Sequence, residues 1–189
     1  MTARLTLICH APTASTRVAR FPLDEPPDAD WAAALAHAEP GLAAATLLTA
    51  PEQRARATAA ALDPAFAVDA ALRDQDFGRW AGRSLADLAA EEPDAVAAWM
   101  GDPAAAPHGG ESLLGLLARV AAWMEAWAAT GGRVAAVTHP AWVRAAVVTA
   151  LGAGAASFWR VEAPPLARAA LSHDGRRWTL AGLVSPPRS

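Results

Sequence analysis

Two histidines of this sequence each follow a short apolar segment. His10 comes after residues 5–9, and His139 comes after residues 134–138. A neutral imidazole can attack an electrophilic phosphorus and form a phosphohistidine, which divides one difficult displacement into two easier ones. A second histidine can neutralise the charge on the phosphoryl oxygens during the transfer. Since an ordinary core histidine would explain either position alone, the hypothesis of a phosphate-binding pocket depends on the pair.

The elements that must position these histidines alternate between strands and helices. Apolar and β-branched runs predict strands at residues 5–9, 46–49, 134–138, 167–172 and 178–183, with a hairpin turn at 173–175. Composition and apolar spacing predict helices at residues 28–38, 54–62, 84–90, 94–100, 112–129 and 142–151. Residues 13–27, 72–82 and 102–110 are predicted to be irregular.

This alternation indicates an α/β protein with a mostly parallel central sheet in a three-layer α/β/α sandwich. In such sheets ligands bind beyond the carboxyl ends of the strands. His10 and His139 are therefore expected to open onto the same edge of the sheet.

The overall composition narrows the classes of protein to consider. The 189 residues, of which 53% are hydrophobic, fit one domain over residues 1–189. The net charge of −3 and the absence of a basic block give no support to nucleic-acid binding. No apolar stretch is long enough to span a membrane, and the start does not resemble a signal peptide. With a single cysteine, Cys9, the sequence predicts a cytoplasmic protein.

Several motifs, taken in order, resemble those of the histidine phosphatase superfamily, the phosphoglycerate-mutase-like proteins. The matching segments are Leu-Thr-Leu-Ile-Cys-His-Ala-Pro-Thr at 5–13, Thr-Ala-Pro-Glu-Gln-Arg-Ala at 49–55 with Thr-Ala at 58–59, Leu-Arg-Asp-Gln-Asp-Phe-Gly-Arg-Trp-Ala-Gly at 72–82, Gly-Gly-Glu-Ser at 109–112, and Thr-His-Pro at 138–140 with Arg144. They cover nearly the whole chain.

The resemblance implies a role for individual residues. His10 would be the nucleophile, Arg54 and His139 would bind the phosphoryl group, and Asp74 would protonate the leaving group. The predicted substrate-binding residues are Thr13, Arg17, Arg20 and Glu111. The implied activity is that of a phosphomonoesterase on a small phosphorylated metabolite, with no metal and no cofactor. The length favours a phosphatase over a mutase, and the Asp-Phe-Gly-x-Trp pattern is similar to that of α-ribazole phosphatases.

The sequence also departs from the family pattern. Cys9 replaces the arginine before the nucleophile, Ala11 and Pro140 replace glycines, and Asp74 is one methylene shorter than the family's glutamate. Loss of one arginine contact to a phosphoryl group costs about 3 kcal/mol, or roughly a hundredfold in rate. Arg17 or Arg20 could replace it; otherwise the chain is a catalytically impaired or non-catalytic binder of phosphate ligands.

Other residues allow further hypotheses. Cys9 could act as in cysteine phosphatases, but Ser15 stands where such an enzyme needs its arginine, so a buried apolar role is predicted. The histidines lack metal-ligand spacing. His37 and His173 are predicted at the surface, and His108 as a residue that could reach the pocket. The predicted pocket walls are Trp80 and Trp142.

Overall fold

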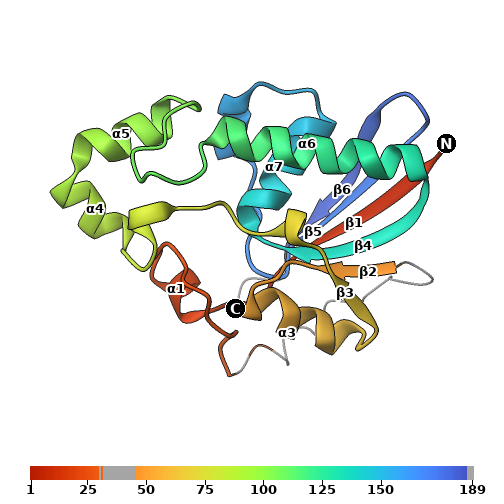
Figure 1. The fold of residues 1–189 in the computed structure, drawn as a ribbon, viewed down its shortest axis with the longest axis horizontal. Coiled ribbons are helices and arrows are strands. Elements are labelled where there is room, and N and C mark those ends of the chain that lie inside the picture. The colour runs from red at the N-terminus through yellow and green to blue at the C-terminus, as the bar shows by residue number, and fades with distance from the viewer. Residues whose placement is uncertain (30, 32–45, 187–189) are drawn as a thin grey trace.

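A six-stranded sheet forms the centre of the protein, seen here in a computed structural model that describes residues 1–29, 31 and 46–186. The strand order is β3-β2-β4-β1-β5-β6 (Figure 1). The strands are β1 (Ala3–Cys9), β2 (Thr46–Thr49), β3 (Phe66–Val68), β4 (Gly132–Thr138), β5 (Arg168–His173) and β6 (Trp178–Val184). The pairs among β1, β2, β3 and β4 are parallel, whereas β5 runs antiparallel to β1 and to β6.

The register of the parallel strands brings the two histidines together. Cys9 at the end of β1 pairs with Thr138 at the end of β4, so His10 and His139 are the next residues of neighbouring strands. The backbone N–H of His10 donates to the carbonyl of Thr138 over 2.8 Å. The predicted shared edge is therefore confirmed.

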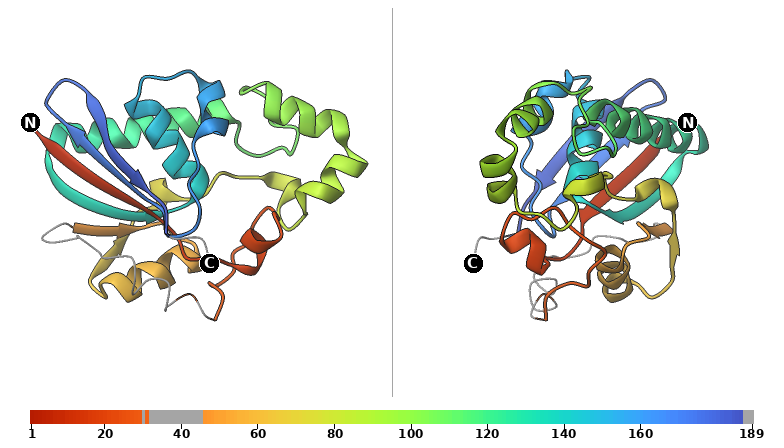
Figure 2. Two further views of the ribbon diagram at one scale, coloured as in Figure 1. Left: turned by 180° about the vertical axis from the view of Figure 1, so that it is seen from behind. Right: turned by 60° about the vertical axis from the view of Figure 1, so that its left-hand side comes forward.

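Helices cover both faces of the sheet, which confirms the predicted three-layer α/β/α arrangement (Figures 1 and 2). On one face lies α3 (Gln53–Leu62), and on the other lie α6 (Leu113–Thr130) and α7 (Pro140–Ala150). The short helices α4 (Leu85–Glu91) and α5 (Pro93–Gly101) extend beyond the carboxyl edge of the sheet. Helix α1 (Ala14–Arg17) lies below them in Figure 1, and single 3₁₀ turns occur at Ala70–Leu72, Gly78–Trp80 and Ala155–Arg160.

Two elements differ from the sequence prediction, and a third is not tested. Residues 13–27 were predicted to be irregular, but they include α1, because the Thr13 side chain accepts from Thr16 N–H and forms a capping box. Strand β3 was missed, since its three residues are too few to show a periodic pattern. The helix predicted at 28–38 lies mostly outside the described residues.

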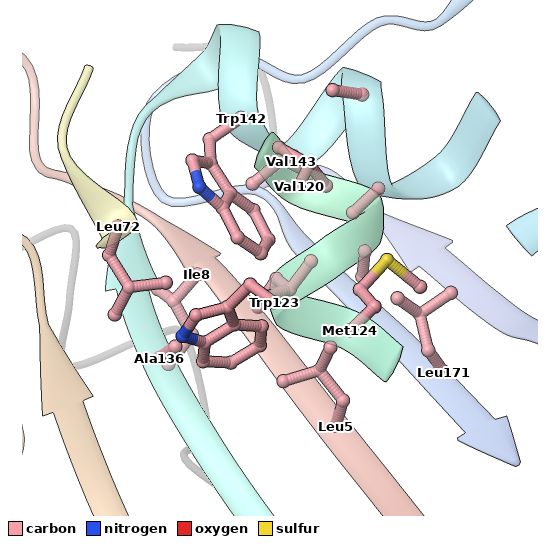
Figure 3. Close-up of a cluster of buried hydrophobic side chains, with 14 of the residues drawn as sticks. Leu5, Ile8, Leu72, Val120, Trp123, Met124, Ala136, Trp142, Val143 and Leu171 are labelled. Carbon is pink, nitrogen blue, oxygen red and sulfur yellow. The ribbon is translucent and has the colours of Figure 1, made fainter. Parts of the chain in front are cut away.

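The main core lies between the sheet and the helix pair α6 and α7 (Figure 3). Trp123 of α6 and Trp142 of α7 meet edge to face, with ring centroids 5.2 Å apart. Val120, Met124 and Leu5 pack around them, and all three are buried. This core fixes β1 and β4, and with them the positions where His10 and His139 begin.

A second, smaller hydrophobic cluster lies in the arm formed by α4 and α5. Its buried members are Phe21, Trp80, Leu88 and Val96. Trp99, which is half-buried, packs on the edge of this cluster. The arm therefore has a core of its own beside the carboxyl edge of the sheet.

Within the described part of the chain, none of the helices is both long and apolar enough to cross a membrane.

Candidate active site

His10 is held in one tautomer by the backbone. Its Nδ1 lies 2.7 Å from the carbonyl oxygen of Ala11. Because a carbonyl can only accept, Nδ1 must carry the proton, which leaves the lone pair on Nε2. Burial, together with the nearby His139 and Arg54, lowers the pKa of His10 well below its usual value. His10 is therefore neutral at physiological pH and has the form of a nucleophile.

His139 lies beside His10 and between two carboxylates. The two imidazole centroids are 5.2 Å apart in an edge-to-face arrangement. The Nε2 of His139 donates to Oε2 of Glu52 over 2.9 Å. On the other side its Nδ1 lies 3.3 Å from Oδ2 of Asp74, without hydrogen-bond geometry. Both carboxylates stabilise a positive charge on this ring.

Glu52 is a site residue that the sequence analysis missed. It stands at the N-cap of α3, and its Oε1 also accepts the backbone N–H of Asp74 over 3.0 Å. Burial alone would raise the pKa of Glu52, but the hydrogen bond and charge of His139 outweigh this effect and lower it to about 2. The glutamate is therefore a carboxylate that joins His139 to the segment carrying Asp74. The signal for it was its place two residues before Arg54 in the matching motif.

Arg54 points from the first turn of α3 into the same site. Its side chain is 2% exposed, and its Nη2 donates to Oδ2 of Asp74 over 2.8 Å. Nη1 donates to the carbonyl of Leu23, but Nε is buried without a hydrogen-bond partner. Arg54 thus holds Asp74 and keeps one buried N–H that an anion could satisfy.

Arg144 of α7 is a second arginine of the site, and the sequence analysis had given it no role. It lines the same cavity as His10, and its guanidinium lies 5.8 Å from the ring of Phe158. Its Nε is also buried without a hydrogen-bond partner, and burial lowers the pKa of Arg144. Since a buried unpaired donor costs about 1–3 kcal/mol, the Nε groups of Arg54 and Arg144 together favour a bound anion.

Cys9 is not suited to act as a nucleophile. It is fully buried, and its Sγ lies 3.7 Å from the carbonyl oxygen of Ala163. Burial raises the pKa of the Cys9 thiol far above its usual range, and the nearby positive charge of Arg144 offsets only part of this. The thiol therefore stays protonated, as predicted for a residue with an apolar packing role.

The cavity beside His10 has a volume of about 220 Å³. Three of the predicted site residues line it: His10, Asp74 and the exposed Arg20. Arg144 lies on the same wall. The remainder of the lining is mainly apolar. We call its five large rings the aromatic wall: Phe21, Phe77, Trp99, Phe158 and Trp159.

A second cavity opens on the other side of Asp74. Its volume is about 450 Å³, and its lining includes Glu52, Arg54 and Arg73. The side chain of Asp74 borders both cavities. Arg54 therefore reaches the site from the opposite side to Arg144.

The other predicted substrate-binding residues do not line the His10 cavity. Arg17 is mostly exposed and forms an ion pair with Asp28. Thr13 is fully buried, and its hydroxyl caps α1. In this structure Arg17 lies at the surface and Thr13 shapes the loop after His10, so neither residue lines the His10 cavity. Arg20 alone remains of the two arginines considered as replacements for the family's arginine.

Glu111 contacts Arg119, which holds the backbone of the segment that carries Asp74. Its two carboxylate oxygens accept from Nε and Nη2 of Arg119 over 2.9 and 2.7 Å. Arg119 in turn donates to the backbone carbonyls of Ala71, Arg73 and Asp74. In this structure Glu111 holds the segment bearing Asp74, and its role in binding substrate stays a prediction.

Two glycines allow the 72–82 and 109–112 motifs to pack backbone against backbone. A Cβ on Gly78, whose φ is +47°, would lie 2.2 Å from the carbonyl oxygen of His108. A Cβ on Gly110 would lie 2.1 Å from the carbonyl oxygen of Asp76. This contact fixes the segment that carries both Asp74 and Phe77.

Two departures from the family pattern are accommodated by the backbone. Ala11 is fully buried but has no positive φ, so its position does not require glycine. Pro140 is the first residue of α7, where the missing N–H has no helical partner to lose. Neither substitution disturbs the histidine pair.

The structure corrects three aromatic assignments. Trp80 and Trp142, predicted as pocket walls, are fully buried in the arm cluster and the main core. His173, predicted at the surface, is 8% exposed, because its ring packs 5.2 Å from that of Trp178. His108 is also buried and packs on Trp80 and Phe77 behind the aromatic wall. His37 lies outside the described residues.

No group of three or more histidine, cysteine, aspartate or glutamate side chains in residues 1–29, 31 and 46–186 is arranged to hold a metal ion.

The family model described as the histidine phosphatase superfamily (branch 1) matches residues 5–185, which is nearly the whole chain. A bifunctional protein of Mycobacterium tuberculosis is 31% identical over 123 residues, which are 62% of this chain and 34% of that protein. A glucosyl-3-phosphoglycerate phosphatase of the same species is 44% identical over 52 residues, 28% of this chain and 23% of that enzyme. This chain thus matches only about a third of the bifunctional protein and about a quarter of the phosphatase.

Solved structures share the fold. The structure titled mycobacterial hydrolase 1 has a TM-score of 0.84 at 25% identity, with 99% of this chain and 100% of that chain covered. Mycobacterial glucosyl-3-phosphoglycerate phosphatase in complex with VO3 has a TM-score of 0.83 at 26% identity, with 95% and 98% covered. A putative α-ribazole-5′-P phosphatase of Escherichia coli is similar in fold, with a TM-score of 0.83 at 21% identity. The match covers 97% of this chain and 96% of that chain.

Proposed function

Because the chain belongs to the histidine phosphatase superfamily, we propose that it is a phosphomonoesterase that hydrolyses a small phosphorylated metabolite through a phosphohistidine at His10. The observation that carries this proposal is the state of His10. Its Nδ1 proton is bonded to the Ala11 carbonyl, so the lone pair of Nε2 is free beside the cavity and His139.

In the first step Nε2 of His10 attacks phosphorus, and the bond between phosphorus and the ester oxygen breaks. Arg54 and Arg144 neutralise the phosphoryl oxygens, since each has a buried N–H without a partner, and His139 lies beside His10 to bind the same group. Asp74 borders the cavity and, once protonated, donates that proton to the departing oxygen and returns to the carboxylate that pairs with Arg54. In the second step Asp74 takes a proton from water, which attacks phosphorus and releases phosphate and neutral His10.

The alternative of a non-catalytic phosphate binder is based on the loss of an arginine at Cys9. Arg144 supports turnover instead, because it lies near Cys9 and lines the cavity with His10. We infer that it supplies the charge that the family obtains from the residue before the nucleophile. Arg20, an exposed residue on the cavity wall, is a weaker substitute because solvent screens its charge.

We further propose that residues 1–189 form one domain that acts in the cytoplasm. The one cysteine, Cys9, is a free thiol, which fits a reducing compartment. The partner is a small phosphorylated substrate, and the proposed steps use only side chains of this chain.

Steady-state hydrolysis of p-nitrophenyl phosphate and glycerol 1-phosphate by wild type and His10→Ala tests the proposal. Loss of the nucleophile should lower kcat by about a thousandfold or more on both esters. The matched control is His173→Ala, which removes a buried histidine beside Trp178 and should retain activity. Equal thermal midpoints of His10→Ala and wild type would exclude unfolding as the cause. A His10→Ala variant as active as wild type would contradict the proposal.

A further inference from the structure

Much of the lining of the His10 cavity consists of aromatic side chains. Rings of the aromatic wall interlock edge to face: Trp99 and Trp159 have centroids 4.9 Å apart, and Phe21 and Trp99 have centroids 5.5 Å apart. Phe21 also packs 4.8 Å from Phe77. Mutual contact holds these rings in place, so the wall is a preformed surface.

Part of this aromatic surface faces the cavity. Phe77, Trp99 and Trp159 are only half-buried, although each packs on a hydrophobic cluster. Apolar surface left in contact with water is unfavourable, and covering it with an apolar group recovers that free energy. The wall therefore favours a ligand that presents an apolar face.

Two of the polar side chains on the cavity wall are already engaged within the chain. The amide nitrogen of Gln75 donates to the carbonyl of Glu111, and the hydroxyl of Thr16 donates to the carbonyl of Thr13. The charge of Arg20, which is exposed at the wall, is screened by solvent. Hydroxyl-rich groups placed against the rings would lose hydrogen bonds to water without replacement.

The size of the cavity gives a further limit. An apolar cavity of about 150 Å³ is enough to bind benzene. The cavity of about 220 Å³ beside His10 therefore has room for one ring together with a phosphoryl group.

We propose that the substrate is a phosphomonoester whose alcohol portion carries an aromatic ring, which stacks on the aromatic wall while the phosphoryl group lies at His10. This inference rests on the proposed phosphatase activity for its chemistry, but the binding surface itself does not depend on turnover. It assigns Trp99 and Trp159 as specificity-determining residues.

The test compares benzyl phosphate with glycerol 1-phosphate and glucose 6-phosphate. All three are esters of primary alcohols, so the chemistry of the leaving group changes little and the portion facing the wall changes greatly. We expect kcat/KM for benzyl phosphate to exceed that for the other two esters by about tenfold or more. A preference for the glycerol or glucose ester would overturn this inference and leave the phosphatase proposal intact.

Variants of the wall make the comparison specific. Trp99→Ala and Trp159→Ala should each lower kcat/KM for benzyl phosphate about five times more than for glycerol 1-phosphate. Trp127→Ala is the matched control, because Trp127 packs on Trp123 of the main core. It should leave the ratio of the two rates unchanged. Equal losses on both esters in the wall variants would overturn the role assigned to them.

Binding of phosphonates gives an answer even if the protein is catalytically silent. Benzylphosphonate should bind wild type about tenfold more tightly than methylphosphonate in calorimetric titrations, since only the former reaches the rings. Absence of hydrolysis of every ester together with this preference would reject the phosphatase proposal and retain the aromatic site. Equal affinities for the two phosphonates would overturn the aromatic site.

Discussion

The histidine pair at the sheet edge and the aromatic wall of the His10 cavity are held in place by different interactions. At the carboxyl edge of the sheet, His10 and His139 follow paired residues of β1 and β4, and directional hydrogen bonds hold each ring. On the aromatic wall, Phe21, Trp99 and Trp159 come from separate segments and meet through ring contacts. Hydrogen bonds fix the orientation of a side chain, whereas apolar contacts allow several orientations.

This difference predicts two kinds of mutational effect. Changes at the sheet edge should affect the reaction of every ester, because the phosphoryl group is common to all of them. Changes on the aromatic wall should depend on the alcohol.

Asp74→Asn should separate leaving-group protonation from phosphoryl binding. We expect kcat for glycerol 1-phosphate to fall by about a thousandfold, because an amide cannot protonate the departing alkoxide. The loss on p-nitrophenyl phosphate should be much smaller, since nitrophenolate leaves without a proton. Parallel assays on the two esters measure the difference. Equal losses would mean that Asp74 acts mainly by holding Arg54.

Arg144→Leu should lower kcat/KM by about a hundredfold on all esters, through loss of one charge on the phosphoryl group. If Arg144 replaces the arginine that the family has at Cys9, adding Cys9→Arg to this variant should recover at least tenfold. Arg133→Leu, an exposed arginine at the start of β4, is the control and should retain activity. A full rate in Arg144→Leu, or no recovery in the double variant, would contradict this role.

Glu52→Gln should lower kcat/KM by about tenfold on every ester. The pKa of Glu52 is lowered to about 2, so the wild-type side chain carries its charge throughout the working range of pH. The amide removes this charge and weakens the contacts that join His139 to the segment carrying Asp74. Steady-state assays measure the loss, and a full rate in Glu52→Gln would contradict this role.

On the acid side, wild-type kcat/KM should lose little from protonation of His10 between about pH 7.5 and pH 6.5. The pKa of His10 lies well below 6.5, so this ring is still neutral there. In the unfolded chain His10 has an ordinary pKa, so its contribution to stability is present above that pKa and is lost as pH falls below it. A rate that follows an ordinary histidine titration in this interval would contradict the assigned state, once titration of the substrate has been measured separately.

Glu111→Gln should have the smallest effect on the reaction. It weakens the two-pronged contact with Arg119 and should lower the free energy of unfolding by about 1 kcal/mol. Urea denaturation measures this loss. The rate should fall only a few-fold, since Arg119 retains its bonds to the backbone carbonyls. A rate loss as large as that of Asp74→Asn would place Glu111 in contact with substrate.

The sheet edge could be predicted because its signals are local in sequence. Apolar runs ending at His10 and His139 defined both strands and the side of the sheet on which they end. Arg54 and Asp74 came from motif resemblance, and the structure places them 2.8 Å apart. The hairpin between β5 and β6 was also confirmed, since both its turn and its strands were visible in sequence.

The aromatic wall could not be predicted because its members have no common spacing. Phe21, Phe77, Trp99 and Trp159 come together only through tertiary folding. Conversely, Trp142 was predicted to line the pocket, but its ring packs in the core and its Nε1 donates to the Ala71 carbonyl. The direction of a side chain depends on packing that sequence spacing does not contain.

Trapping of the intermediate shows whether His10 carries the phosphoryl group during turnover. Rapid acid-free quenching of wild type and Asp74→Asn during turnover of a ³²P-labelled ester, followed by peptide mapping, locates the label. We expect a base-stable, acid-labile label on the peptide containing His10, which is absent from His10→Ala. A label on another residue during steady turnover, or full activity of His10→Ala, would show that His10 is not the nucleophile.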